Sequence, residues 1–223
     1  MGKIKTEKSV EIPKLNIETF KIKIIGDSSL IVHAWSTKAK IMMLDKMTKK
    51  ATKAKETRRP VVEFADSLYW LTEKPNLDGL TDEEAIAILN EVIPKSKFGI
   101  PSRGFKLSVV NGGFQQGALV KSAGGADLAK TTARGAFFVL NEFAEINGIP
   151  TIREDMVRVG MGSADIRYRA EFKTWDTTLT IKYNTSAISM EQIINLFNIG
   201  GFSNGVGEER PEKDGMHGTY HVE

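Results

Sequence analysis

Histidine is the side chain best suited to acid–base chemistry near neutral pH, and this sequence contains only three. His33 lies in the apolar run Leu30–Trp35 and is the one candidate for a general acid or base. The same position also suits a buried histidine with an internal hydrogen-bond partner, and both interpretations stay open. No triad partner for His33 is evident in the sequence. We therefore assign no catalytic residue and expect a protein that is not an enzyme.

The sequence offers few ligands for a metal ion. Without cysteine, thiolate zinc sites and iron–sulfur clusters are excluded. His217 and His221 are four residues apart, but Gly218 lies between them in a segment with an extended pattern. Their rings are then not expected to converge as they would on one face of a helix. We expect neither a metal nor a cofactor.

A glycine-rich stretch near the end of the chain, residues 200–218, could bring backbone close to a ligand. Phosphate-binding glycine loops follow a strand and open a helix, so that the helix N-terminus meets the phosphate. Here an amphipathic helix ending at Gly200–Gly201 comes first and a strand follows. This order argues against a nucleotide cofactor. We expect instead a backbone platform beside a nucleic-acid strand or a neighbouring subunit, formed by Gly205, Gly207, Gly215 and Gly218.

The segment from residue 38 to residue 59 is strongly basic, and only Asp45 and Glu56 oppose its positive charges. Its basic residues are Lys38, Lys40, Lys46, Lys49, Lys50, Lys53, Lys55, Arg58 and Arg59. Beyond Met47 it has no apolar stripe that would pack against a core. Two interpretations stay open: a solvated loop, or a basic finger that becomes ordered on a phosphate backbone.

The elements that must hold these residues follow from hydrophobic periodicity. Residues 164–172 and 175–183 alternate as two strands that we expect to pair with each other. Residues 190–197 follow a helical pattern, and Tyr220–Val222 alternates again. Phe20–Ile25 offers a first strand. We predict an α+β protein with a ferredoxin-like (RRM-like) antiparallel sheet and helices on one face, with an inserted helical segment, a hairpin and the basic finger.

The remaining segments of the chain are predicted from shorter signals. Pro60 and Pro101 suit helix starts, and Thr81–Glu84 and Ser189–Gln192 have the spacing of capping boxes. Asn147-Gly148 is the strongest two-residue hairpin signal in the chain and predicts that its flanking strands pair.

The sheet face away from the helices is predicted to be basic. It would carry Lys21, Lys23, Arg167, Arg169, Lys182 and His221. The alternative is the ordinary solvated face of an antiparallel sheet. We favour binding because Asp165 and Glu171 are outnumbered by the cations of this face.

Length and composition are those of an ordinary folded protein, with 223 residues, 41% hydrophobic and 26% charged, and a net charge of +3. We expect a single domain over residues 1–223, with a flexible arm at 1–15 and the basic insertion at 38–59. No apolar run is long enough to span a bilayer, and the polar start has no signal-peptide pattern. We therefore expect a cytoplasmic protein without a membrane partner.

Three stretches together carry a resemblance to a known family. They are the strand Phe20–Ile25, the segment Ile100-Pro101-Ser102-Arg103-Gly104-Phe105-Lys106, and the glycine-rich run Gly200–Pro211 with its continuation Gly215-Met216-His217-Gly218-Thr219-Tyr220. The chain in this respect resembles the RAMP superfamily of CRISPR-associated RNA-binding proteins, most of all the backbone subunit that polymerises on guide RNA. In that family the second stretch reads "IPG-S-x-KG", whereas here the glycine is displaced to Gly104.

The resemblance implies a ferredoxin-like protein that binds single-stranded nucleic acid, RNA favoured, across a basic palm with a gripping finger. It further implies subunits that stack into a filament or helical oligomer. The chain also has the general look of a stand-alone phage or prophage gene product, which would act in a bacterial host. Possible partners are single-stranded RNA or DNA and a CRISPR or other defence complex. The alternatives are a metal-independent endoribonuclease using His33, a phage single-stranded-DNA-binding protein, and a protein that interferes with host defence.

The residues expected to bind nucleic acid are those that would lie on the palm, the finger and the glycine-rich run. They are Lys21, Lys23, Lys46, Lys49, Lys50, Lys53, Lys55, Arg58, Arg59, Arg103, Lys106, Arg167, Arg169, Lys182 and Arg210. Trp35, Phe114 and Phe202 are the candidates for stacking on bases, although none of them falls on the predicted basic face.

Overall fold

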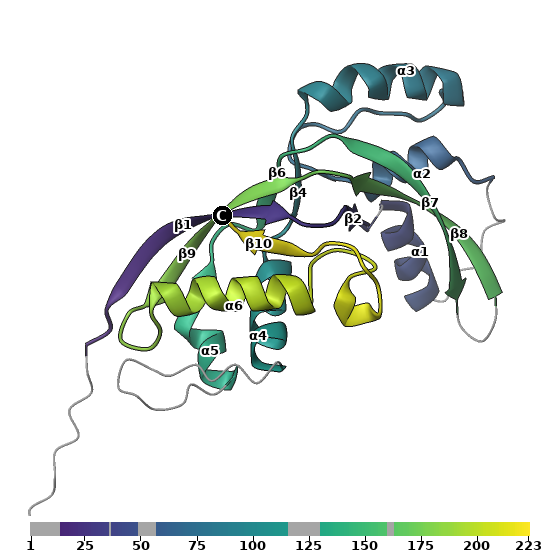
Figure 1. Ribbon diagram of the computed structural model, residues 1–223. Coiled ribbons are helices and arrows are strands. Elements are labelled where there is room, and N and C mark those ends of the chain that lie inside the picture. Colours follow the sequence, from purple (N-terminus) through teal and green to yellow (C-terminus); the bar gives the residue numbers. More distant parts are fainter. Residues whose placement is uncertain (1–13, 36, 49–56, 116–129, 160–162) are drawn as a thin grey trace, which may run out of the picture.

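The computed structural model describes residues 14–35, 37–48, 57–115, 130–159 and 163–223 (Figure 1). Within these ranges the chain forms three antiparallel sheets with helices packed around them. The central sheet has the strand order β10-β1-β9-β5, made of Tyr220–Val222, Ile17–Gly26, Asp176–Asn184 and Phe137–Val139.

The central sheet has ferredoxin-like topology. The chain runs from β1 through helices α4 (Arg103–Gln115) and α5 (Lys130–Ala136) to β5 at one edge. It then runs from β9 through α6 (Met190–Ser203) to β10 at the other edge. Two crossovers of this kind interleave, so that every pair of neighbours in the sheet is antiparallel. The predicted α+β, ferredoxin-like class is confirmed.

Period-2 alternation decides which face of the central sheet is buried. Ile22 pairs with Leu179 and Ile24 with Thr177, and all four side chains are buried. Helices α4, α5 and α6 all lie on this side of the sheet (Figure 1). The intervening residues of β1 and β9 therefore form an opposite face that no described helix covers.

Glycines allow α6 to pack closely against its neighbours. A Cβ on Gly200 would overlap the backbone of Ser108 in α4, and one on Gly201 would overlap the carbonyl oxygen of Tyr220 in β10. Helix α6 thus runs through both glycines to Ser203. The predicted helix end at Gly200–Gly201 is wrong, because these glycines serve packing and do not terminate the helix.

Two smaller sheets flank the central one. One has the order β2-β8-β7, made of Leu30–Val32, Ser163–Phe172 and Pro150–Val159. The other has the order β3-β4-β6, made of Tyr69–Trp70, Phe98–Pro101 and Phe143–Ile146. Strands β7 and β8 form a long hairpin that extends away from α6 (Figure 1).

The inserted helices lie around the β7–β8 hairpin and the β3-β4-β6 sheet. They are α1 (Thr37–Met47), α2 (Pro60–Ser67) and α3 (Asp82–Val92), followed by the short 3₁₀ helix η1 (Ile93–Lys95). A second 3₁₀ helix, η2 (Pro211–Lys213), lies in the glycine-rich loop. The capping boxes predicted at Thr81 and at Ser189 are both present, and Pro60 opens α2.

Two predictions about strand pairing are wrong. The strand at 164–172 does not pair with the strand at 176–184, because β8 pairs with β2 and β7 whereas β9 pairs with β1 and β5. Asn147-Gly148 does not close a hairpin, since β6 pairs with β4 and β7 with β8. At both places a short connection carries the chain from one sheet to another. In the central sheet, the position of the second strand of a ferredoxin-like fold is taken by β5, which pairs with β9.

No helix in the described ranges has both the length and the apolar character needed to span a bilayer. The basic segment is described only as α1, Thr48 and residues 57–59. The arm at 1–15 falls outside the described residues except for residues 14 and 15.

Substituting Gly201 with alanine tests the close contact between α6 and β10. We expect Gly201→Ala to lower the free energy of unfolding by about 1–3 kcal/mol, because the new methyl group displaces the Tyr220 backbone. Gly135→Ala in α5 is the matched control, since nothing lies within 4 Å of its Cβ position. Urea unfolding measures both. An unchanged midpoint for Gly201→Ala would contradict this account of the packing.

Candidate nucleic-acid interface

The open face of the central sheet carries an exposed aromatic ring beside two lysines. Phe138 in β5 lies directly opposite Lys182 in β9, and both side chains are exposed. Lys182 in turn lies opposite Thr19, and Lys21 two residues further along β1 is opposite Thr180. Cross-strand and diagonal neighbours lie about 5–8 Å apart. We call Phe138, Lys182 and Lys21 the aromatic–lysine face.

Phe138 is held in place by its neighbours and yet remains accessible. Its ring is 50% exposed, a large fraction for a phenylalanine. The Lys106 ammonium from α4 lies 4.2 Å from the ring centroid and donates a hydrogen bond to the Arg134 carbonyl oxygen at 2.6 Å. Partial burial lowers the pKa of Lys106. Lys106, expected to bind nucleic acid, therefore borders the aromatic–lysine face.

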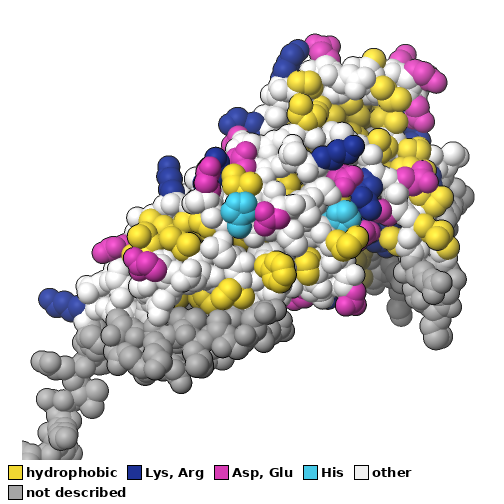
Figure 2. Space-filling view, in the orientation of Figure 1, with side chains coloured by type: hydrophobic (Ala, Val, Ile, Leu, Met, Phe, Trp, Pro, Cys, Tyr) yellow, Lys and Arg dark blue, Asp and Glu magenta, His cyan; other side chains and the backbone are white. Residues whose placement is uncertain are grey.

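Charge is distributed unevenly over the open face. At the β10 side, Lys23 pairs with Glu223 at 2.6 Å and His221 Nδ1 lies 2.6 Å from an Asp27 carboxylate oxygen. Lys21 and Lys182 form no ion pair with any described residue. Figure 2 shows further Lys and Arg side chains projecting from the left margin of the molecule. The unpaired positive charge is thus concentrated on the Phe138 side.

Arg167 and Arg169 do not lie on this face, contrary to prediction, because β8 belongs to another sheet. Arg169 is 3% exposed and its Nη1 donates to Glu209 Oε1 at 2.8 Å and to Asp155 Oδ2 at 3.4 Å. Arg153 joins Asp155 at 2.7 Å and Glu171 at 3.2 Å. We call these five side chains the buried ionic cluster. Its arginines are neutralised within the fold.

The buried ionic cluster continues into the glycine-rich loop. Ser29 Oγ donates to Glu171 at 2.6 Å and lies 2.8 Å from Nδ1 of His217. Because the hydroxyl has one proton, which it gives to Glu171, Nδ1 of His217 must be the donor in the second bond. His217 thus has Ser29 as a structural partner, whereas His221 lies beside Asp27.

The glycines of the loop contact other backbone of the same chain. A Cβ on Gly215 would overlap the Glu209 carbonyl and one on Gly218 the Val206 carbonyl. Gly205, Gly207 and Gly218 have φ values of 63°, 81° and 69°. Gly207 approaches the Ile31 carbonyl oxygen. The close backbone approach that we predicted exists, and its partner in the structure is the protein itself.

Arg210 closes the loop by folding back over it. Its Nη1 donates to the Gly207 carbonyl oxygen at 2.8 Å, and its Nε and Nη2 donate to Glu212 at 2.9 and 2.7 Å. These bonds use most of the donors of the guanidinium group. Arg210 therefore stabilises the loop, and no contact of it favours a role in binding.

The described part of the basic segment contains carboxylate-paired arginines. Arg58 bonds Glu63 at 2.7 Å and Asp165 at 2.8 Å, and Arg59 bonds Asp82 at 2.9 Å. The bond from Glu63 raises the pKa of Arg58. Lys46 lies in α1, and Lys49, Lys50, Lys53 and Lys55 lie outside the described residues. The basic finger stays a prediction.

His33 lines a cavity of about 930 Å³ between α1, α2 and β8. Burial, and then the nearby Arg169, lower its pKa, so that the ring is neutral at pH 7. Its Nδ1 is buried and has no hydrogen-bond partner in the described structure. Arg58 and Arg59 in the same cavity are paired as above. His33 is thus half-buried, with its Nδ1 atom buried but without the internal hydrogen-bond partner that was expected for a buried histidine.

The other predicted contacts are scattered. Arg103 is exposed at the start of α4, Trp35 is 60% exposed beside the cavity of His33, and Phe202 is 77% exposed at the end of α6. Nothing is described for the Phe114 side chain. Phe138 was missed because its short strand was not recognised as a member of the central sheet. The three consecutive apolar residues Phe137, Phe138 and Val139 indicate a strand, but without alternation they do not show which ring is exposed.

A metal centre is not formed by the described residues, among which no group of three or more His, Asp or Glu side chains converges.

Substituting Arg169 and Arg167 one at a time tests how much each of these two arginines of β8 contributes to stability. Arg169→Gln is expected to lower the free energy of unfolding by about 1.5–3 kcal/mol, because it removes a buried guanidinium group that donates to Glu209 and Asp155 and leaves Arg153 as their remaining cation. Arg167→Gln, whose side chain is 37% exposed and 3.9 Å from Asp165, should change it by less than about 0.5 kcal/mol. Urea unfolding compares the two. Equal effects would refute the buried ionic cluster as a stabilising unit.

Comparisons with known proteins leave the family open. No protein-family model matches this chain, and no curated protein sequence matches it. The crystal structure of Cmr6 from Pyrococcus furiosus aligns with 94% of this chain and 100% of its own, with 10% identical residues and a TM-score of 0.33. So distant a likeness carries no argument about function. The function has to be argued from the surface of the protein.

Proposed function

We propose that this protein binds single-stranded nucleic acid, RNA in preference to DNA, without chemical turnover, and that the strand crosses the aromatic–lysine face. The observation that carries the proposal is the exposed Phe138 ring with Lys182 directly opposite. Bases of a single strand stack on exposed aromatic rings, and lysines neutralise the phosphates between them. The proposal requires no metal and no cofactor.

The physical setting supports this face over the other positively charged surfaces. Lys21 and Lys182 are exposed and form no ion pair with a described residue, so they are available to phosphates. The arginines of the His33 cavity and of the buried ionic cluster already have carboxylate partners. Taking those arginines away would leave unpaired carboxylates behind, which costs free energy.

Assembly into a filament is part of the proposal and rests on a separate feature. Helix α1 exposes a set of large apolar side chains, an unusual concentration for the surface of a monomer. They are Ile41, Met42, Met43, Leu44 and Met47. A neighbouring copy is one partner that would cover them, and the stand-alone phage or defence-related role remains a prediction.

Binding by the aromatic–lysine face is tested with fluorescein-labelled 12-mers of RNA in anisotropy titrations. Phe138→Ala should weaken binding about tenfold through loss of stacking. Lys21→Gln and Lys182→Gln should each weaken binding and lower the slope of log affinity against log salt by about 0.7. The same oligonucleotides in DNA form test the preference for RNA.

Two substitutions away from the face serve as matched controls. Phe202→Ala removes a ring that is more exposed than Phe138, and Lys95→Gln removes a lysine whose side chain is 72% exposed. Both variants should bind as the wild type does. If Phe138→Ala also binds as the wild type does, or if no oligonucleotide binds, the proposed function is wrong.

A second candidate function is metal-independent cleavage of RNA by His33. The observation in its favour is the lowered pKa, which keeps the imidazole in its basic form at pH 7. Because Nδ1 is buried, we expect labelled RNA to stay intact with the wild type and with His33→Ala in excess chelator. Gel electrophoresis after prolonged incubation measures this. Cleavage by the wild type that His33→Ala abolishes would replace the binding proposal with an enzymatic one.

A further inference from the structure

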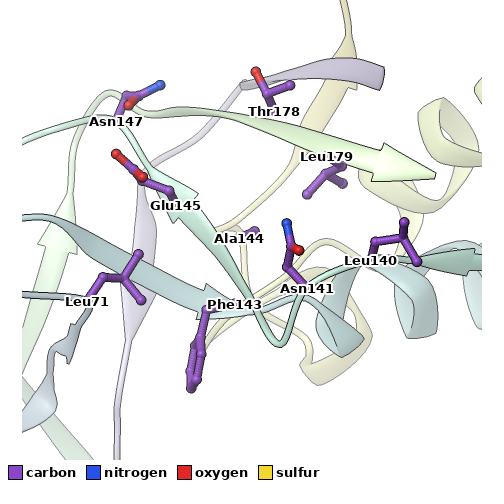
Figure 3. Close-up of a pocket in the computed structure, with 9 residues that line it drawn as sticks. All are labelled: Leu71, Leu140, Asn141, Phe143, Ala144, Glu145, Asn147, Thr178 and Leu179. Carbon is purple, nitrogen blue, oxygen red and sulfur yellow. The ribbon is translucent and has the colours of Figure 1, made fainter. Parts of the chain in front are cut away.

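A pocket lies beside the aromatic–lysine face, at the junction of two sheets. It has a volume of about 420 Å³, which is within the range of small-molecule sites. Leu71, Leu140 and Leu179 supply apolar walls, and Asn141 and Thr178 supply polar groups (Figure 3). Figure 3 shows the Asn141 amide directed toward the middle of the pocket, between Ala144 and Leu179.

The pocket is continuous with the open face of the central sheet. Thr178 is exposed on the same face of β9 as Lys182, four residues away, which corresponds to about 13 Å along the strand. Asn141 follows Phe138 by three residues, and the backbone between them is fixed by a 2.8 Å bond from the Leu140 N–H to the Thr180 carbonyl. A strand that stacks on Phe138 and follows β9 therefore reaches the pocket.

Asn141 is the amide of the pocket that the fold leaves available, beside the exposed hydroxyl group of Thr178. Glu145 pairs with Lys97 at 2.9 Å, and Asn147 donates to Asp176 at 2.7 Å. The Asn141 amide is exposed and has no hydrogen-bond partner among the described residues. Its backbone has φ of 68°, a left-handed conformation that asparagine tolerates better than most residues and glycine tolerates best.

We propose that this pocket takes one base of the bound strand and that Asn141 makes it prefer adenine, an inference that rests on the proposed function. An asparagine amide has one donor and one acceptor side by side, which match N7 and the N6 amino group of adenine. Guanine presents two acceptors, N7 and O6, at the same edge, and so leaves the amide oxygen facing an acceptor. Leu71 and Leu140, which are accessible at the pocket, would pack against the base.

The test uses uridine 12-mers in which the central base is replaced by adenine, guanine or cytosine, again in anisotropy titrations. For the wild type we expect the adenine oligonucleotide to bind about tenfold tighter than all-uridine. Asn141→Gly keeps the left-handed backbone and removes the amide. Asn141→Asp keeps the shape but has no donor when ionised. Both variants should lose the preference and bind all-uridine as the wild type does.

The outcomes separate this inference from the proposed function. Equal binding of all four oligonucleotides by the wild type overturns the adenine pocket and leaves the proposed function intact. A preference that persists in Asn141→Gly overturns it as well, because the amide is then not its cause. Absence of binding to every oligonucleotide overturns the proposed function itself. Asn195→Ala, an exposed position on α6, is the control and should keep the preference.

Discussion

The close packing of α6 against α4 and β10 is the constraint on which the open face depends. Gly200 and Gly201 let the helix approach the backbone of both neighbours, where any side chain would overlap. Tyr220 reinforces the contact through a 2.5 Å hydrogen bond between its hydroxyl group and that of Ser108, in a site where burial raises the pKa of the tyrosine. With both crossover helices held on one side, the other side of β1 and β9 stays uncovered by described helices.

A second interaction fixes the β7–β8 hairpin relative to this core. The buried ionic cluster brings together two arginines and three carboxylates from β7, β8 and the glycine-rich loop. Arg169 and Asp155, the buried members of the cluster, require close partners, since an unpaired buried charge costs several kcal/mol. Glu209 therefore has a structural role within the glycine-rich loop. Its neighbour Glu208 binds through its backbone, donating an N–H to the Ile31 carbonyl at 2.9 Å.

The same electrostatics distinguish structural cations from those available for binding. Arg58, Arg153 and Arg169 each have carboxylate partners, so these arginines contribute to the fold. Lys21 and Lys182 have no described partner and lie next to an exposed ring. The net charge of +3 is small, so the whole surface is not basic. Binding of nucleic acid would depend on the local concentration of positive charge at Lys21 and Lys182.

Much of the local structure was determined by the sequence itself. Alternation in β1 and β9 predicted which side chains are buried, and the capping boxes at Thr81 and Ser189 predicted where α3 and α6 begin. These signals are readable because they depend on residues a few positions apart. The α+β class and the placement of Lys21 and Lys182 on one face follow from them.

Only the tertiary structure decided which strands pair and which cations are free. Strand β8 has a strong alternating pattern, but the pattern alone does not say that its partners are β2, whose paired residues are 138–142 positions away, and β7, whose paired residues are 4–22 positions away. Nor does it say that Arg169 would be buried against Glu209. Phe138 became part of the open face because β5 pairs with β9. Asn141 lines a pocket because the chain leaves the central sheet after β5 and β6 pairs with β4 in a different sheet. Such contacts join residues far apart in the chain, and a local pattern carries no information about the partner.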